Sequence, residues 1–275
     1  MTTFIGLDLA WTPHHETGIC VIEGHGHAAR LVVLEARIGT VEWFAQLCCS
    51  FGEDVVVAID APLIVGPGRR AERELAAVFG AAKASAYTAS PAFLARMNGM
   101  AGPDLAALLR TRGFQVVPSA LIPRAGGRVA VEVFPHPAHV ELFGLAERIP
   151  YKKGRIAERR AAFALYQDYL RALIAREIPG LLDDTRLLDV LSRVAAARKG
   201  KALKAVEDQL DAVTCAYVAH HCWLAPGSFR VFGDDGNGAI VVPLARGAGL
   251  HALRGGHPHE AEHAGQRNAR GEHQP

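Results

Sequence analysis

Three acidic residues stand within or at the end of otherwise apolar stretches of the sequence. Asp8 follows the run FIGL, Asp60 ends DVVVAID, and Glu132 lies within VAVEVF. A carboxylate buried in a strand destabilises the fold unless it is paired or binds a metal. If the three strands are adjacent, their acids converge at one end of a sheet, where α/β proteins form their sites. The pattern predicts a group of carboxylates whose mutual repulsion a divalent cation relieves.

A further pair of acids lies in the segment EDQLDA at 207–212. Asp208 and Asp211 are spaced i and i+3, so they share one face of a helix. Taken alone, these acids could simply lie in the first turn of a helix, where negative charge interacts favourably with the helix dipole. Beside Asp8 and Asp60 they extend an oxygen-only ligand set, which suits Mg²⁺ or Mn²⁺. The predicted metal ligands are Asp8, Asp60, Asp208 and Asp211.

Basic residues surround these acids in the sequence. Lys152, Lys153 and Arg155 lie in YKKGR and are predicted to bind substrate phosphates. A second basic block, 193–204, leads directly into the acidic segment, and both blocks are also compatible with solvated helix faces. The segment KASAYTASP at 83–91 offers Ser85 and Tyr87 to a substrate cleft, or forms a plain polar loop.

Short apolar strands and amphipathic helices must position these side chains. The first three strands, joined by tight turns, favour an antiparallel meander, and the apolar run 54–60 is typical of a parallel strand covered on both faces. The predicted fold is α/β, with a mixed five-stranded sheet flanked by helices, a helical insertion and a C-terminal hairpin around Asn237-Gly238. Strands are predicted at 4–10, 17–23, 28–37, 54–60 and 129–134, and helices at 41–51 (capped by Thr40), 155–175, 185–198 and 203–223.

Residues 1–245 are predicted to form a single domain, with a helical insertion at 61–128 and additional helices at 150–200. Residues 246–275, rich in histidine, are predicted to be a disordered tail.

Composition limits the class of protein. Of 275 residues, 50% are hydrophobic and 21% charged, which excludes a wholly disordered chain. No apolar stretch approaches the ~18–20 residues that cross a bilayer, so we expect no membrane partner. Five cysteines without a CxxC motif indicate a cytoplasmic location. A net charge of +2 permits a nucleic-acid partner without requiring one, and the sequence does not set the oligomeric state.

The order of these motifs resembles the DUF429 family, described as predicted nucleases with a ribonuclease H-like fold. The closing DQLDA is similar to the end of the Holliday-junction resolvase active site. His136 stands where the family often has an acidic residue. The segments that carry the resemblance are GLDLAW at 6–11, AIDAPL at 58–63, RRAERELAAVFG at 69–80, VEVFPHPA at 131–138, YKKGR at 151–155 and DQLDAVTCAY at 208–217.

The resemblance implies metal-dependent hydrolysis of a phosphodiester in DNA or RNA. Asp8, Asp60, Glu132 and Asp211 would be the catalytic carboxylates, with Asp8 bridging two metals and Glu132 or Asp208 completing the set. Two alternatives stay open besides a sugar-kinase or actin-like ATPase, against which the lack of a glycine-rich hairpin after Asp8 argues. One is a non-catalytic RNase H-like scaffold that binds nucleic acid or protein. The other is a hydrolase of a small phosphorylated or nucleotide-like molecule, with the insertion 61–128 closing the cleft to polymers.

Overall fold

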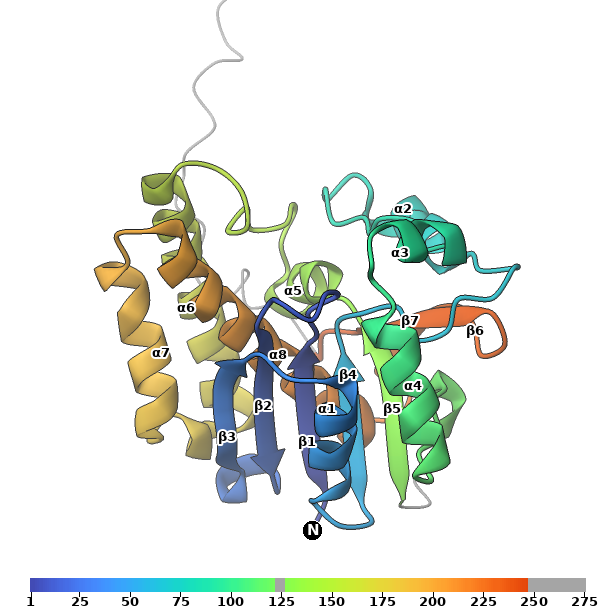
Figure 1. Ribbon diagram of the computed structural model, residues 1–275. Helices are drawn as coiled ribbons and strands as arrows, with labels where there is room; N and C mark the ends of the chain where they lie inside the picture. The colour runs from blue at the N-terminus through green and yellow to red at the C-terminus, as the bar shows by residue number, and fades with distance from the viewer. Residues whose placement is uncertain (122–126, 247–275) are drawn as a thin grey trace, which may run out of the picture.

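The computed structural model describes residues 1–121 and 127–246. In that part of the chain, seven strands form one mixed sheet in the order β3-β2-β1-β4-β5-β7-β6 (Figure 1). β1 pairs antiparallel with β2 and parallel with β4, and the parallel pairing continues through β5 to β7. The strands are β1 (Thr3–Asp8), β2 (Thr17–Glu23), β3 (Arg30–Arg37), β4 (Val55–Ile59), β5 (Arg128–Val133), β6 (Phe229–Asp234) and β7 (Gly238–Pro243).

Helices join and cover these strands. Thr40 caps the first helix as predicted, because its side chain accepts a hydrogen bond from the N–H of Trp43 at 3.2 Å. The helices are α1 (Val41–Cys49), α2 (Ala71–Phe79), α3 (Pro91–Arg96), α4 (Ala101–Thr111), α5 (Pro135–Phe143), α6 (Ile156–Glu177), α7 (Thr185–Ala196) and α8 (Gly200–Leu224), with short 3-10 turns η1 (Gly26–Ala28), η2 (Pro118–Leu121) and η3 (Pro179–Leu181).

The C-terminal hairpin extends the sheet. The described residues therefore form a seven-stranded sheet, whereas the sequence predicted five strands with a separate hairpin. β7 runs parallel to β5, and Glu132 and Val133 pair with Ile240 and Val241. Without β7, β5 would present unpaired N–H and C=O groups along a sheet edge. Every residue of β7 is buried, so the hairpin also contributes to the core.

Helices cover both faces of the sheet (Figure 1). Helix α8 lies against β1, β2 and β4, and Phe4 and Ala58 belong to the core on that face. Ile5, Leu7 and Val57 belong to the core on the opposite face, which α1 and α4 cover. Because side chains alternate along a strand, the even-numbered residues of β1 and β4 face α8.

The segment 61–128, predicted as a helical insertion, contains α2, α3 and α4. Leu75 and Phe79 of α2 pack with Phe232 of the hairpin, and α4 contacts α1. Residues 122–126 of this segment, and all of the predicted tail 246–275 except Arg246, lie outside the described residues. None of the helices in the described residues has the length and apolar character needed to cross a membrane.

Candidate functional site

The parallel strands β1 and β4 end at the same edge of the sheet and bring two carboxylates together. Asp8 is the last residue of β1, and Asp60 follows β4 directly. The N–H of Asp60 donates to the carbonyl of Leu7 at 2.8 Å, which continues the ladder to this point. Both aspartates are even-numbered, so their side chains project from the face that α8 covers.

Two glycines allow α8 to lie directly on the sheet. A Cβ on Gly6 would lie 2.0 Å from a backbone oxygen of α8, and a Cβ on Gly18 would lie 1.8 Å from the backbone oxygen of Asp208. No other residue can occupy these positions without moving the helix, because these distances are far below contact. Asp8 pairs with Gly18 across the sheet, so the close approach puts Asp208 and Asp211 beside Asp8.

We refer to Asp8, Asp60, Asp208 and Asp211 as the aspartate cluster. Burial, with the neighbouring Asp8, raises the pKa of Asp208 to about 8. Burial also raises the pKa of Asp8, and it raises the pKa of Asp60 well above its usual value. Oδ2 of Asp8 is buried and has no hydrogen-bond partner among the described residues. These properties indicate a group of carboxylates that is short of positive charge.

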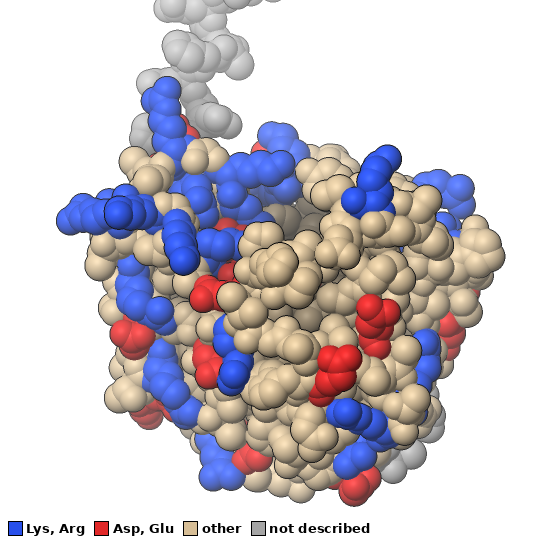
Figure 2. All heavy atoms as spheres, viewed as in Figure 1, with Lys and Arg blue, Asp and Glu red and all other residues tan. Residues whose placement is uncertain are grey.

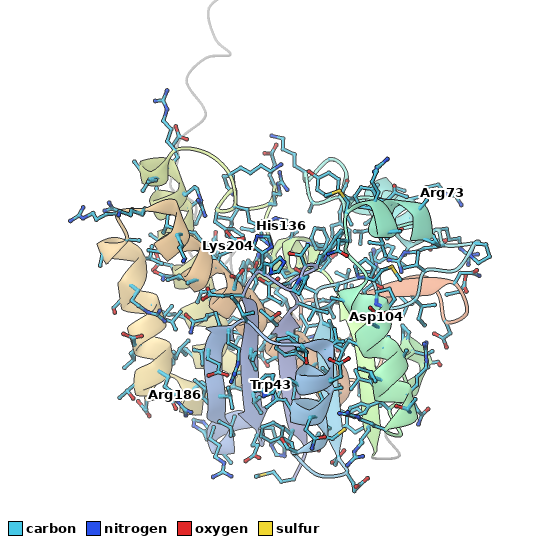
Figure 3. The ribbon with its side chains drawn as sticks, viewed as in Figure 1. Trp43, Arg73, Asp104, His136, Arg186 and Lys204 are labelled. Atoms are coloured by element: carbon cyan, nitrogen blue, oxygen red, sulfur yellow. The ribbon has the colours of Figure 1, made fainter. Side chains whose placement is uncertain are left out.

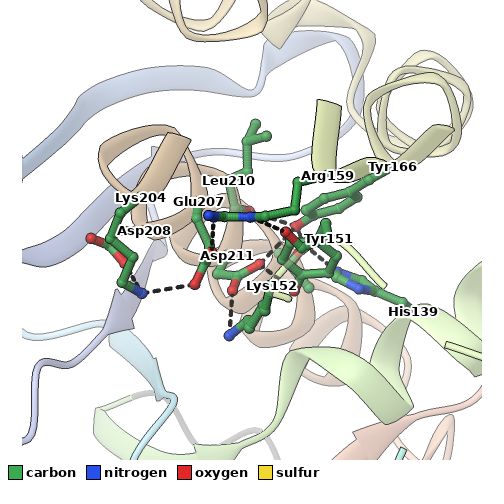
Figure 4. A network of polar contacts seen from close by, with 11 residues as sticks. His139, Tyr151, Lys152, Arg159, Tyr166, Lys204, Glu207, Asp208, Leu210 and Asp211 are labelled. Atoms are coloured by element: carbon green, nitrogen blue, oxygen red, sulfur yellow. Dashed lines mark hydrogen bonds and ion pairs between the residues drawn. The ribbon is translucent and has the colours of Figure 1, made fainter. Parts of the chain in front are cut away.

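Two lysines supply cations to the aspartate cluster (Figure 4). Nζ of Lys152 lies 2.8 Å from Oδ2 of Asp211, and Nζ of Lys204 lies 2.7 Å from Oδ1 of Asp208. Burial alone would lower the pKa of Lys152. The carboxylates around it raise that pKa well above the usual value, so Lys152 is an ammonium ion. Burial would raise the pKa of Asp211, but Lys152 lowers it below its usual value.

A buried polar network fixes the orientation of Asp211 (Figure 4). The hydroxyl of Tyr151 donates to Oδ1 of Asp211 at 2.8 Å, and that of Tyr166 donates to the same oxygen at 3.3 Å. Tyr166 also lies 2.6 Å from Oγ1 of Thr214, which lies 3.1 Å from Nε2 of His139. Burial lowers the pKa of His139 to about 4, so its ring is neutral. Sequence reasoning missed these residues, and the only signal for them was the place of Tyr151 at the start of YKKGR.

Glu132 lies on the opposite face of the sheet from Asp60. It pairs with Ile59, one residue before Asp60, and successive residues project from opposite faces. Its carboxylate accepts hydrogen bonds from Arg69 at 2.5 and 3.1 Å and from the N–H of Leu63 at 3.0 Å. Two residues were predicted to complete the carboxylate set. The structure places Asp208 beside Asp8, whereas Glu132 forms a salt bridge with Arg69.

A cavity of about 520 Å³ opens beside the aspartate cluster, and Asp60 and Lys152 line it. His136 lies in its wall with only 5% of its surface exposed, and Nδ1 has no hydrogen-bond partner among the described residues. Burial, followed by the charge of Lys152, holds the pKa of His136 well below its usual value, so the ring is neutral. Figure 3 shows His136 above the sheet.

The structure separates the three basic residues predicted to bind substrate. Lys152 contacts the aspartate cluster, and Lys153 lines the cavity with Nζ 3.5 Å from the hydroxyl of Tyr87. Arg155 is exposed at the residue before α6. Ser85 and Tyr87, from the predicted polar loop, both line the cavity. Figure 2 shows Lys and Arg side chains gathered on the upper part of the face, around a hollow.

Within residues 1–121 and 127–246, no three His, Cys, Asp or Glu side chains are already arranged to hold a metal ion. Nζ of Lys152 already contacts Oδ2 of Asp211, so a metal ion that used this oxygen would have to displace the lysine.

A family model with the description "Protein of unknown function (DUF429)" matches residues 6–237. The matched range includes both glycines under α8 and the whole aspartate cluster. No curated protein matches the chain.

Proposed function

The chain belongs to the DUF429 family, and from the site it carries we propose that it is a divalent-metal-dependent phosphodiester hydrolase acting on nucleic acid. The observation that carries the proposal is the aspartate cluster, in which two buried carboxylates, Asp208 and Asp211, and two partly buried ones, Asp8 and Asp60, share two lysines. The order of elements supports an RNase H-like fold: a strand ending in Asp, a hairpin, a helix, a parallel strand followed by Asp, and a late helix bearing two aspartates.

The residues of the aspartate cluster fit a hard divalent cation in donor chemistry and in charge. Carboxylate oxygens are the ligands that Mg²⁺ and Mn²⁺ prefer. Burial, and after it the neighbouring acids, raises the pKa of Asp8, Asp60 and Asp208, and Oδ2 of Asp8 has no partner among the described residues. A cation bound there would remove that repulsion.

Each residue near the cluster has a role in this proposal. Asp8, Asp60, Asp208 and Asp211 would hold the metal. Tyr151 keeps Asp211 in one orientation through its hydrogen bond. When bound, the metals would activate a water molecule and stabilise the leaving oxygen of the phosphodiester. Lys152, released from Asp211, would neutralise a phosphate in the cavity.

Exposed basic residues on the same side of the molecule support a nucleic-acid substrate. Arg198, Lys199 and Lys201 lie at the start of α8, and Lys153 and Arg155 precede α6. Figure 2 shows Lys and Arg gathered over this region. If these residues contact phosphates, the binding constant for single-stranded DNA will fall steeply as the salt concentration increases. A binding constant that does not change with salt concentration would contradict this part of the proposal.

Calorimetric titration with Mn²⁺, combined with a strand-cleavage assay on DNA and RNA, tests the proposal. We expect wild type to bind Mn²⁺ and cleave, and Asp8→Asn to lose both properties. Asp104→Asn is the matched control, because Asp104 is an exposed aspartate in the first turn of α4, away from the cluster (Figure 3).

Two results would contradict the proposal. One is full activity in Asp8→Asn. The other is a wild type that binds no Mn²⁺, alone or with nucleic acid present, which would favour a non-catalytic scaffold.

A further inference from the structure

We propose that the cavity beside the aspartate cluster binds one nucleoside monophosphate unit, either free or at the end of a strand. The phosphate would lie toward Asp60 and Lys152, and the base against the aromatic side chains of the wall. This inference rests on the proposed function, because it names the part of the substrate that the same site holds.

The size of the cavity fits one nucleotide. At about 520 Å³ it falls within the usual range for small-molecule sites. Residues 83–87 of the insertion and residues 148–153 before α6 form part of its wall. Nζ of Lys153 lies 3.5 Å from the hydroxyl of Tyr87, so the two segments meet at the cavity.

The charge of the wall fits an anion. Glu72 and Glu132 line the cavity, but both are bound by Arg69. Arg148 and Lys153 also line it, and neither has a carboxylate partner among the described residues. With Glu72 and Glu132 paired, Asp60 is the remaining acid of the wall, and Arg148 and Lys153 supply two cations that attract a phosphate.

The aromatic side chains fit a base. Tyr87 lines the cavity and is 76% exposed, which is unusual for so large an aromatic residue. Trp11 and Phe134 also line the cavity. Bases stack on exposed aromatic rings whatever their identity. The unpartnered Nδ1 of the buried His136 supplies a hydrogen-bonding atom for the same ligand.

The position of Asp60 and Lys152 sets the direction of the ligand. Both residues line the cavity and both belong to, or contact, the aspartate cluster. The phosphate therefore lies at the end where the proposed hydrolysis takes place, and the base lies at the end near Tyr87.

The test titrates the full chain with AMP, adenosine and inorganic phosphate, first in chelator and then with Ca²⁺. Calorimetry gives the affinity, and tryptophan fluorescence reports on Trp11 in the wall. We expect saturable binding of AMP, tighter than binding of either fragment. Tyr87→Ala and Lys153→Ala should each weaken AMP about tenfold. Arg110→Ala, an exposed arginine in the last turn of α4 that does not line the cavity, is the matched control and should change nothing.

Competition by longer ligands distinguishes the two sources of the nucleotide. If the cavity takes a strand end, linear single-stranded DNA displaces AMP and circular single-stranded DNA does not. If it takes only free nucleotides, neither displaces AMP. Equal displacement by circular DNA would overturn the inference, since it requires an internal nucleotide to enter.

Absence of saturable AMP binding under both conditions would also overturn it, as would binding that Tyr87→Ala and Lys153→Ala leave unchanged. These failures leave the proposed function standing, because Mn²⁺ binding by the aspartate cluster is measured separately. Conversely, AMP binding in chelator is measured with no metal bound, so it can succeed where Mn²⁺ binding fails.

Discussion

Arg69→Met should destabilise the protein strongly, because it removes the one cation that holds two buried carboxylates. The guanidinium of Arg69 lies 2.7 Å from Glu72 and 2.5 Å from Glu132, and only 3–6% of these three side chains is exposed. Removing one partner of a buried ion pair typically costs about 3–5 kcal/mol, since the other charge stays buried without compensation. We therefore expect Arg69→Met to lower the free energy of unfolding by about 3–5 kcal/mol.

The effect should also depend on pH. Burial raises the pKa of Glu132, and Arg69 opposes that shift. Without Arg69 the pKa of Glu132 rises further, so the folded state binds a proton more tightly than the unfolded state. A raised folded-state pKa means stability that is present at low pH and is lost as the pH rises. The deficit of Arg69→Met should therefore shrink on acidification toward about pH 5.

Urea unfolding followed by circular dichroism measures these changes. Arg70→Met is the matched control, because the pair Arg70–Glu74 has side chains 46% and 36% exposed and should contribute less than about 1 kcal/mol. Arg69→Met/Glu132→Leu should recover part of the loss, because it removes one uncompensated charge. Glu132→Gln should lower stability and leave Mn²⁺ binding intact. A Glu132→Gln variant that unfolds like wild type but no longer binds Mn²⁺ would refute the reasoning and identify Glu132 as a ligand.

Three more variants test the site itself. Gly18→Ala puts a Cβ 1.8 Å from a backbone oxygen of α8, so it should lose about 1–3 kcal/mol or more in urea unfolding and bind Mn²⁺ more weakly; unchanged Mn²⁺ affinity would contradict this. Lys152→Met removes the ammonium beside Asp211, so Mn²⁺ should raise its melting temperature more than that of wild type, and an equal rise would argue against displacement of Lys152. Asp208 has a folded-state pKa of about 8, so without metal its charge destabilises the fold as the pH rises. Asp208→Asn should therefore gain stability relative to wild type between about pH 5 and about pH 8, by at most about 1.4 kcal/mol per pH unit, and a relative loss would contradict the assigned shift.

Residues whose placement follows from local periodicity were predictable from the sequence. Asp208 and Asp211 share a helix face because of their spacing, and that face meets the sheet. The apolar run 54–60 indicated a parallel strand, and because β1 is the strand that pairs parallel with it, Asp8 and Asp60 lie at one edge. Thr40 caps α1 through a hydrogen bond that the sequence pattern anticipates.

Glu132 shows where such reasoning stops. Its strand is buried on both faces, so the apolar residues around it do not alternate with polar ones and do not reveal which face each side chain takes. Only the register with β4 sets the face, and a shift of one residue reverses it. The salt bridge between Lys152 and Asp211 was equally hidden, because two distant segments meet only in the folded chain.

Lys152 belongs to the aspartate cluster and to the cavity at once. Its ammonium is bound to Asp211, and its side chain forms part of the wall together with Asp60. A cation bound by the aspartates would repel that ammonium, and the phosphate of a ligand in the cavity would offer it a new partner. Metal and nucleotide should therefore strengthen each other's binding, and linkage makes the effect equal in both directions. In the proposed mechanism Lys152 would stabilise the carboxylates before the metal binds and would contact the phosphate once the metal displaces it from Asp211.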